Sequence, residues 1–161
     1  MKNNYRIVAQ NRKANYEYFI EQEYNAGIVL QGSEIKSLRT CGANIQDSHI
    51  ELNENELYIH NLNIAQYRLA TVFRHEPSRK KKLLLNRKEI NKIGGKIKLK
   101  GFTCIPLVLY INDKNYAKLK IAVAKGKKLY DKRQSIRDRE NKREEMRIVK
   151  ERIVRTTREQ S

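Results

Sequence analysis

The chain has 161 residues, with 35 Lys and Arg against 18 Asp and Glu, so its formal net charge is +17. This length suits one domain with a tail, and no apolar run approaches the roughly 20 residues that cross a membrane. No apolar segment of a secretory signal occurs before Lys36, so we expect a cytoplasmic protein. A positive charge of this size favours a polyanionic partner, above all nucleic acid.

The first third of the chain predicts two strands and a helix. Residues 16–21 alternate apolar with polar side chains, and residues 27–30 form a short apolar run, so both are typical of strands. Residues 33–39 predict a helix with Ser33 as its N-cap and the acid Glu34 in its first turn.

The middle of the chain adds a hairpin, a second helix and two longer strands. Residues 50–59 place a polar turn between two alternating apolar pairs, which predicts a hairpin. Residues 77–93 predict a helix that ends at a Gly-Gly pair. Residues 103–111 and 116–124 predict strands, and Pro106 indicates an edge or a bulge in the first of them. Short strands with two inserted helices predict a mainly β fold with helices, an OB-like closed antiparallel barrel.

The end of the chain has a different composition. From Asp131 onward there is no Gly or Pro, and Arg, Glu and Lys dominate. Such a segment favours a helix, but its apolar stripe is too thin to hold one in water without support. We therefore expect residues 1–130 to form the body and residues 131–161 to form a basic tail, disordered when free and helical on an RNA surface. A solvated helix docked on the body is the alternative.

Signals of catalysis or of metal binding are weak throughout the sequence. His49, His60 and His75 have no partner at metal-ligand spacing, and the first two are expected on the solvent face of the hairpin. Cys41 and Cys104 are too isolated for a zinc site or a disulfide framework. No phosphate-binding loop or nucleophile elbow occurs. We therefore predict no catalytic residue, metal or cofactor, and we do not expect an enzyme.

Three basic clusters can neutralise phosphates, at residues 11–14, 79–82 and 125–133. The second cluster also fits the solvated first turn of a helix. In the third, Gly126 allows a sharp bend after the last strand, and Tyr130 offers a flat ring for stacking on an unpaired base.

These clusters belong to an ordered set of motifs. They are NRKA (residues 11–14), AGIVL (26–30), GSEIKSLR (32–39), AN (43–44), RKKKLLL (79–85) and KGKKLYDKR (125–133). In this order they resemble the SsrA-binding protein family, also called small protein B or SmpB, from about residue 8 to about residue 150.

The resemblance implies an OB-like barrel with two to three flanking helices and a basic C-terminal tail. It also implies binding of the tRNA-like domain of transfer-messenger RNA (tmRNA) and its delivery to stalled ribosomes, a process called trans-translation. Elongation factor Tu would take part indirectly, through the RNA. The protein would be a monomer in the cytoplasm, without enzyme activity or cofactor and without contact with membranes.

The resemblance also assigns residues. Those implied to bind tmRNA are Asn11, Arg12, Lys13, Asn25, Glu34, Lys36, Arg39, Lys82, Leu85, Lys125, Lys127 and Lys128. Those implied to reach the decoding centre and the message channel of the small subunit are Tyr130, Asp131, Lys132, Arg133, Arg137, Arg139, Lys142 and Arg143.

Two positions depart from the family pattern. Asn25 stands where members often carry Glu, so an amide replaces a carboxylate acceptor. The sequence TCG at residues 40–42 lacks the Gly-Lys pair usual there and so lacks a cation. A ribosomal or ribosome-assembly protein with a basic extension remains the alternative function, and an RNA-modifying enzyme is a third, for which the sequence shows no residues.

Overall fold

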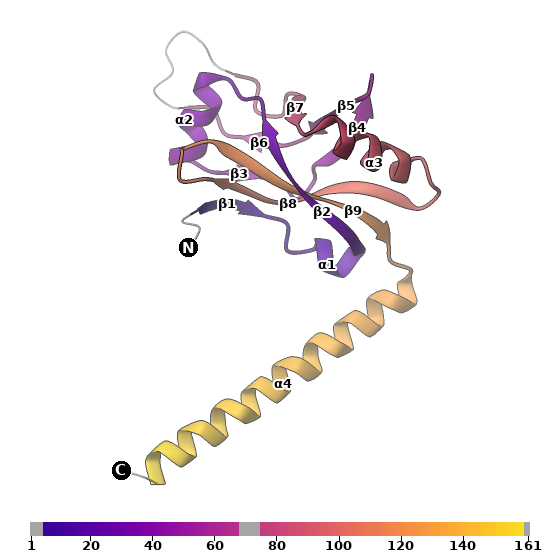
Figure 1. Cartoon of the computed structure of the whole chain (residues 1–161). Helices are drawn as coiled ribbons and strands as arrows, with labels where there is room; N and C mark the ends of the chain where they lie inside the picture. Colours follow the sequence, from indigo (N-terminus) through magenta and orange to yellow (C-terminus); the bar gives the residue numbers. More distant parts are fainter. Residues whose placement is uncertain (1–4, 68–74, 160–161) are drawn as a thin grey trace. The chain divides into compact units, whose positions relative to one another are not determined.

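The computed structural model describes residues 5–67 and 75–159, with side chains up to residue 149 (Figure 1). Its elements in chain order are β1 (Arg6–Gln10), α1 (Ala14–Glu17), β2 (Tyr18–Ile28), α2 (Gly32–Thr40), β3 (Ala43–Asn44), β4 (His49–Asn53), β5 (Glu56–His60), β6 (Asn63–Ile64), β7 (Lys81–Leu84), α3 (Arg87–Ile97), β8 (Phe102–Ile111), β9 (Ala117–Gly126) and α4 (Leu129–Glu159). One compact unit extends to Gly126, and a second begins at Lys127.

The strands of the first unit close on themselves. The main sheet has the order β1-β8-β4-β5-β7-β2-β9, and β9 also pairs with β8. Every pairing is antiparallel, so six strands form a continuous ring and β1 adds to the outside of β8. This arrangement confirms the mainly β, OB-like class expected from the sequence.

The interior of the ring holds the core, because successive side chains of a strand point to opposite faces. In β9, Leu119 and Ile121 are fully buried while Lys118 and Lys120 are only partly covered. Helix α3 adds Ile90 to this core. The other large core side chains come from strands β5 to β8, from α2 and α3, and from the residues that follow β3 and β5: Leu38, Ile45, Leu57, Ile59, Leu62, Ile64, Leu83, Ile93 and Leu109.

Local predictions in two strand regions are confirmed. The hairpin of β4 and β5 turns through Glu54 and Asn55, whose φ angles of 48° and 61° are those of a two-residue turn matched to strand twist. In β8 the register against β9 shifts between Pro106 and Val108, which is the bulge that the proline indicated.

The helix predicted over residues 77–93 is wrong. Its first half contains strand β7, in which Lys81 and Leu83 point inward. The helix itself begins at Arg87 and continues through both glycines to Ile97. Gly94 packs against β4, since an added Cβ would lie 2.8 Å from a methyl carbon of Leu52.

The N-cap predicted for α2 is also wrong. The helix begins one residue earlier, and its N-cap is Gln31 rather than Ser33. The Gln31 backbone N–H donates to the Glu34 carboxylate at 2.7 Å, which completes a capping box.

The second unit is dominated by helix α4. Its side chains from residue 137 to residue 149 are all exposed, including Met146 and Val149. These exposed side chains give the helix little support from packing. The expectation that the tail is disordered in free solution stays a prediction.

Candidate nucleic-acid interface

The outer face of β1, β8, β9 and β2 carries a row of polar side chains. Strand register places Gln10 opposite Val108, Val108 opposite Lys120, and Lys120 opposite Asn25. All four side chains therefore point to the same outer face of the barrel. Asn25 belongs to the predicted RNA-binding set, and this register gives it three neighbours that the sequence reading did not include.

A second row runs parallel to the first one. Ile7, Tyr110, Lys118 and Gly27 lie opposite one another in turn on the same four strands, and Gly27 lies opposite Leu84 of β7. The side chain of Leu84 is 52% exposed.

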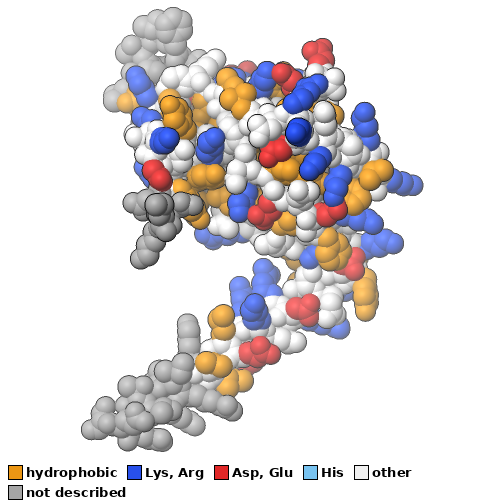
Figure 2. Space-filling model, in the orientation of Figure 1, with side chains coloured by type: hydrophobic (Ala, Val, Ile, Leu, Met, Phe, Trp, Pro, Cys, Tyr) orange, Lys and Arg blue, Asp and Glu red, His pale blue; other side chains and the backbone are white. Residues whose placement is uncertain are grey.

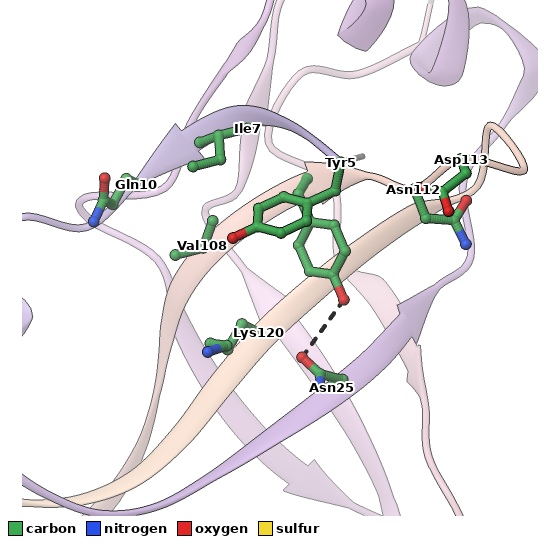
Figure 3. A pocket seen from close by; sticks show the side chains of 9 residues that line it. Tyr5, Ile7, Gln10, Asn25, Val108, Asn112, Asp113 and Lys120 are labelled. Carbon is green, nitrogen blue, oxygen red and sulfur yellow. Dashed lines mark hydrogen bonds between the residues drawn. The ribbon is translucent and has the colours of Figure 1, made fainter. Parts of the chain in front are cut away.

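An open pocket lies over these two rows (Figure 3). Its volume is about 520 Å³, and its lining residues are Tyr5, Ile7, Gln10, Asn25, Val108, Tyr110, Asn112, Asp113 and Lys120. The rings of Tyr5 and Tyr110 meet edge to face, with centroids 5.3 Å apart. The Tyr110 hydroxyl donates to the Asn25 side-chain oxygen at 3.5 Å.

The basic cluster before α1 lies against the middle of β8. The Asn11 amide nitrogen donates to the Pro106 carbonyl at 3.4 Å, and its backbone N–H donates to the Leu107 carbonyl at 2.8 Å. Arg12 and Lys13 follow and are exposed. Asn11 therefore fixes the loop and leaves two cations in solvent.

The exposed cations of α2 lie on the side of the β8–β9 turn. The Arg39 guanidinium donates to the Asn115 carbonyl in the β8–β9 turn at 3.2 Å. Lys36 is exposed one turn earlier on α2. Because Pro106 and Leu107 lie in the middle of β8 and Asn115 lies in the turn after it, these cations do not form one cluster with Lys13. They flank the outer face and its pocket.

Glu34 is buried and cannot touch an RNA in this structure. Its carboxylate accepts hydrogen bonds from Arg79 at 2.8 and 2.5 Å and lies 3.5 Å from the Lys81 ammonium. Both Glu34 and Lys81 are fully buried. Burial raises the pKa of Glu34, but the hydrogen bonds from Arg79 and the Gln31 backbone outweigh it, so the pKa is lowered overall.

Lys81 is held in the interior by oxygen atoms. Its ammonium donates to the carbonyls of Leu62, Pro77 and Arg79 at 3.0 to 3.3 Å. Burial lowers the pKa of Lys81, and the charge of Glu34 opposes that effect. The pair therefore ties α2 to the segment before β7, and Glu34 acts on the surface through the position of α2.

The removal of the Glu34 charge is expected to destabilise the body. Glu34→Gln keeps the size of the side chain but leaves Lys81 without its counter-ion, which costs about 3 kcal/mol for a buried pair. The lowered pKa of Glu34 means that this stability is present above pH 4.5 and is lost as the pH falls through the folded-state value. Urea unfolding at pH 7 and pH 3.5 measures both effects.

The control is Glu56→Gln, which breaks the partly exposed pair of Glu56 and Lys82 at 2.6 Å. Solvent screens that pair, so its loss is expected to have a much smaller effect. Equal losses at the two sites would contradict the role given to the buried pair.

The β7 segment presents a different leucine from the predicted one. Leu85 packs against the core, whereas its neighbour Leu84 is exposed beside Gly27. Lys82 points outward and pairs with Glu56. The alternation of a strand would have indicated that Leu84 is the exposed leucine. The segment was predicted as a helix, so this pattern was not applied to it.

The division between the two compact units lies within the third basic cluster. Lys125, the last residue but one of β9, lies opposite Phe19, while Lys127 and Lys128 open the second unit. The Lys127 ammonium donates to the Ser135 hydroxyl at 2.8 Å.

The first turn of α4 is capped by its own acid. The Lys128 backbone N–H donates to the Asp131 carboxylate at 3.1 Å, so this acid satisfies a backbone donor at the start of the helix. Tyr130 is 78% exposed, Lys132 is half-buried and Arg133 is exposed. The other predicted channel residues are exposed along the helix: Arg137, Arg139, Lys142 and Arg143.

Figure 2 shows Lys and Arg side chains spread over the visible face of the barrel unit and along α4. Among the described residues no group of His, Cys, Asp and Glu could hold a metal ion. His49 and His60 stack across the β4–β5 hairpin at 5.1 Å, whereas His75 is buried against Ser33. No helix in the described part of the chain is both long and apolar enough to span a membrane.

Comparison with known proteins gives a consistent result. The family model described as "SmpB protein" matches residues 8–151. The chain belongs to the SmpB family. An "SsrA-binding protein" of Wolbachia sp. subsp. Drosophila simulans (strain wRi) is 51% identical over 144 residues, which cover 89% of this chain and 97% of the relative.

Other SmpB relatives match equally well. An "SsrA-binding protein" of Anaplasma marginale (strain St. Maries) is 50% identical over 147 residues, covering 91% of this chain and 99% of the relative. A solved structure described as "tmRNA-SmpB: a journey to the center of the bacterial ribosome" aligns with a TM-score of 0.63 and 41% identity, covering 74% of this chain and 84% of that chain. The SmpB match includes both the barrel and most of α4, so all the predicted site residues lie within it.

Proposed function

We propose that the protein binds tmRNA through its tRNA-like domain and delivers it to stalled ribosomes for trans-translation. The observation that carries the proposal is the identity of about half with SsrA-binding proteins across nearly the whole chain, body and tail together. The charge of +17 and the exposed cations on both units suit an RNA partner.

The two units have separate tasks in this proposal. The outer face of the barrel, with Lys13 close to the middle of β8 and Arg39 at the β8–β9 turn, binds the folded RNA by shape and phosphate contacts. The tail, from Tyr130 onward, enters the decoding centre and the empty message channel. Elongation factor Tu joins only through the RNA.

The protein acts in the cytoplasm as a monomer and as an RNA-binding factor with no catalytic step of its own. The support for this part is that the sequence offers no catalytic motif and that its exposed cations suit phosphate binding.

A pull-down separates this function from that of a ribosomal protein. The tagged chain is recovered from cells before and after a high-salt wash of the ribosomes, and the bound RNA is sequenced. We expect one small RNA, tmRNA, to co-purify with the protein, which salt releases from ribosomes. A protein that stays on salt-washed ribosomes without tmRNA would favour the ribosomal-protein alternative.

Residues 1–130 alone are expected to fold and to bind tmRNA nearly as tightly as the full chain. All buried core residues among those described lie at or before Ala124, so truncation removes no core contact. Circular dichroism and filter binding measure the two properties. A hundredfold loss of affinity would show that the tail belongs to the RNA-binding surface.

A further inference from the structure

We propose that the pocket on the outer face of β1, β8, β9 and β2 receives one unpaired nucleobase of the bound RNA. This proposal rests on the proposed function and adds a specific contact to it. The volume of about 520 Å³ lies in the range of about 300–1,000 Å³ that is usual for small-ligand pockets.

The pocket offers an aromatic surface. Tyr5 is 53% exposed and packs edge to face on Tyr110, with an angle of 60° between the rings. Figure 3 shows the Tyr5 ring over the pocket, with Ile7 and Val108 on one side. Exposed tyrosine rings are the surfaces on which proteins stack unpaired bases.

Polar groups around these rings match the edges of a base. Asn25 and Gln10 are exposed, and the Asn25 amide nitrogen has no hydrogen-bond partner among the described residues. A primary amide presents a donor and an acceptor in one plane, as a base edge does. Asp113, on the far side of the pocket in Figure 3, adds an acceptor for an exocyclic amine.

The surroundings of the pocket favour RNA as the occupant. Exposed cations lie on two sides of it: Lys13 follows Asn11, which contacts Pro106 and Leu107 in the middle of β8, and Arg39 contacts the β8–β9 turn. Lys120, inside the pocket, is paired with Glu23 at 3.0 Å, so the pocket itself is not a phosphate site. A strand of RNA held by its phosphates at both ends would pass over the pocket and could insert one base.

Substitution of the exposed ring tests the proposal. The full-length chain and its Tyr5→Leu variant are titrated with a tmRNA transcript at several salt concentrations. Loss of a stacked base is expected to weaken binding about tenfold. The salt dependence should stay unchanged, because no phosphate contact is lost. Tyr5→Phe keeps the ring and should bind as the wild type does.

Two further variants serve as controls. Tyr116→Leu removes another tyrosine, 64% exposed, that does not line the pocket, and it should bind tmRNA normally. Asn25→Leu removes the amide and leaves Tyr5 unchanged. It should also weaken tmRNA binding, and this loss cannot come from an effect of the Tyr5 substitution on folding. Circular dichroism confirms that each variant is folded.

A photo-crosslinking amino acid in place of Tyr5 then identifies the base. We expect a crosslink to one nucleotide of tmRNA. Removal of that base should weaken wild-type binding about tenfold and Tyr5→Leu binding no further.

Normal tmRNA binding by Tyr5→Leu would overturn the proposal that the pocket receives a base, and it would leave the proposed function unaffected. A Tyr5 probe that forms no crosslink to tmRNA in a complex that still assembles would overturn it as well. A wild-type chain that does not bind tmRNA would overturn the proposed function itself.

Discussion

Replacement of Asp131, Lys132 and Arg133 by Ala is expected to leave tmRNA binding almost unchanged and to abolish peptide tagging on stalled ribosomes. The Asp131 carboxylate caps the first turn of α4 at the Lys128 backbone N–H. Its loss should lower the stability of the helix N-terminus by about 1 kcal/mol. Loss of the two cations removes two phosphate contacts in a channel walled by RNA, an effect that grows with salt.

The measurement runs tmRNA binding and tag addition in parallel on the same triple variant. A matched variant replaces Asp138, Lys142 and Arg143, which changes the charge equally but leaves the capped first turn intact. We expect that variant to retain part of the tagging activity. Normal tagging by the first variant would contradict the role of this turn, and equal loss of binding and tagging would assign it to the RNA-binding body.

Replacement of Lys13, Lys36 and Arg39 by Ala is expected to weaken tmRNA binding by about one to two orders of magnitude at physiological salt. All three are exposed; Lys13 lies close to the middle of β8, and Lys36 and Arg39 belong to α2, where Arg39 contacts the β8–β9 turn. Each lost phosphate contact should lower the salt slope by about 0.7–0.9, so the slope should fall by about 2–3.

The control removes the same charge elsewhere. Lys88, Lys92 and Lys100 are exposed on α3 and just after it. Their triple Ala variant is expected to bind tmRNA within a small factor of the wild type. Equal weakening by both triple variants would mean that net charge alone, and not the outer face, accounts for the affinity.

Strands with regular alternation could be predicted from the sequence. Polar and apolar residues alternate cleanly in β9, and the β4–β5 hairpin carries turn residues at its tip. The capping hydrogen bond of Asp131 also joins residues close in sequence, because an acid three residues after a helix start can reach the backbone N–H there. Such a contact can be predicted without knowledge of the fold.

Strand β7 could not be predicted in this way. A lysine in the segment RKKKLLL reads as solvated, yet Lys81 is buried because carbonyl oxygens and Glu34 surround its ammonium. Glu34 is 47 positions away in sequence, and only the fold brings it near. Gly94 is a second case in which only the fold gives the answer. A Gly-Gly pair is typical of a helix end, but Gly94 lies inside α3, where the absence of a side chain allows close packing on Leu52.

The resemblance proposes RNA-binding residues, but it does not give their arrangement. Nothing local in the sequence indicates that Tyr5 and Asn25 line one pocket, since strand register across β1, β8, β9 and β2 brings them together. Glu34 matched a motif, and only the structure shows that its side chain is buried.

The absence of core side chains from the described part of the tail has a consequence for how mutations act. Substitutions in the barrel change the fraction of folded protein, and with it the amount that survives in the cell. Substitutions along α4 up to residue 149 remove no buried contact, so they should change activity at constant abundance. We therefore expect selection to act on tail variants through their activity in ribosome rescue. Selection on barrel variants should act first through degradation of the unfolded protein.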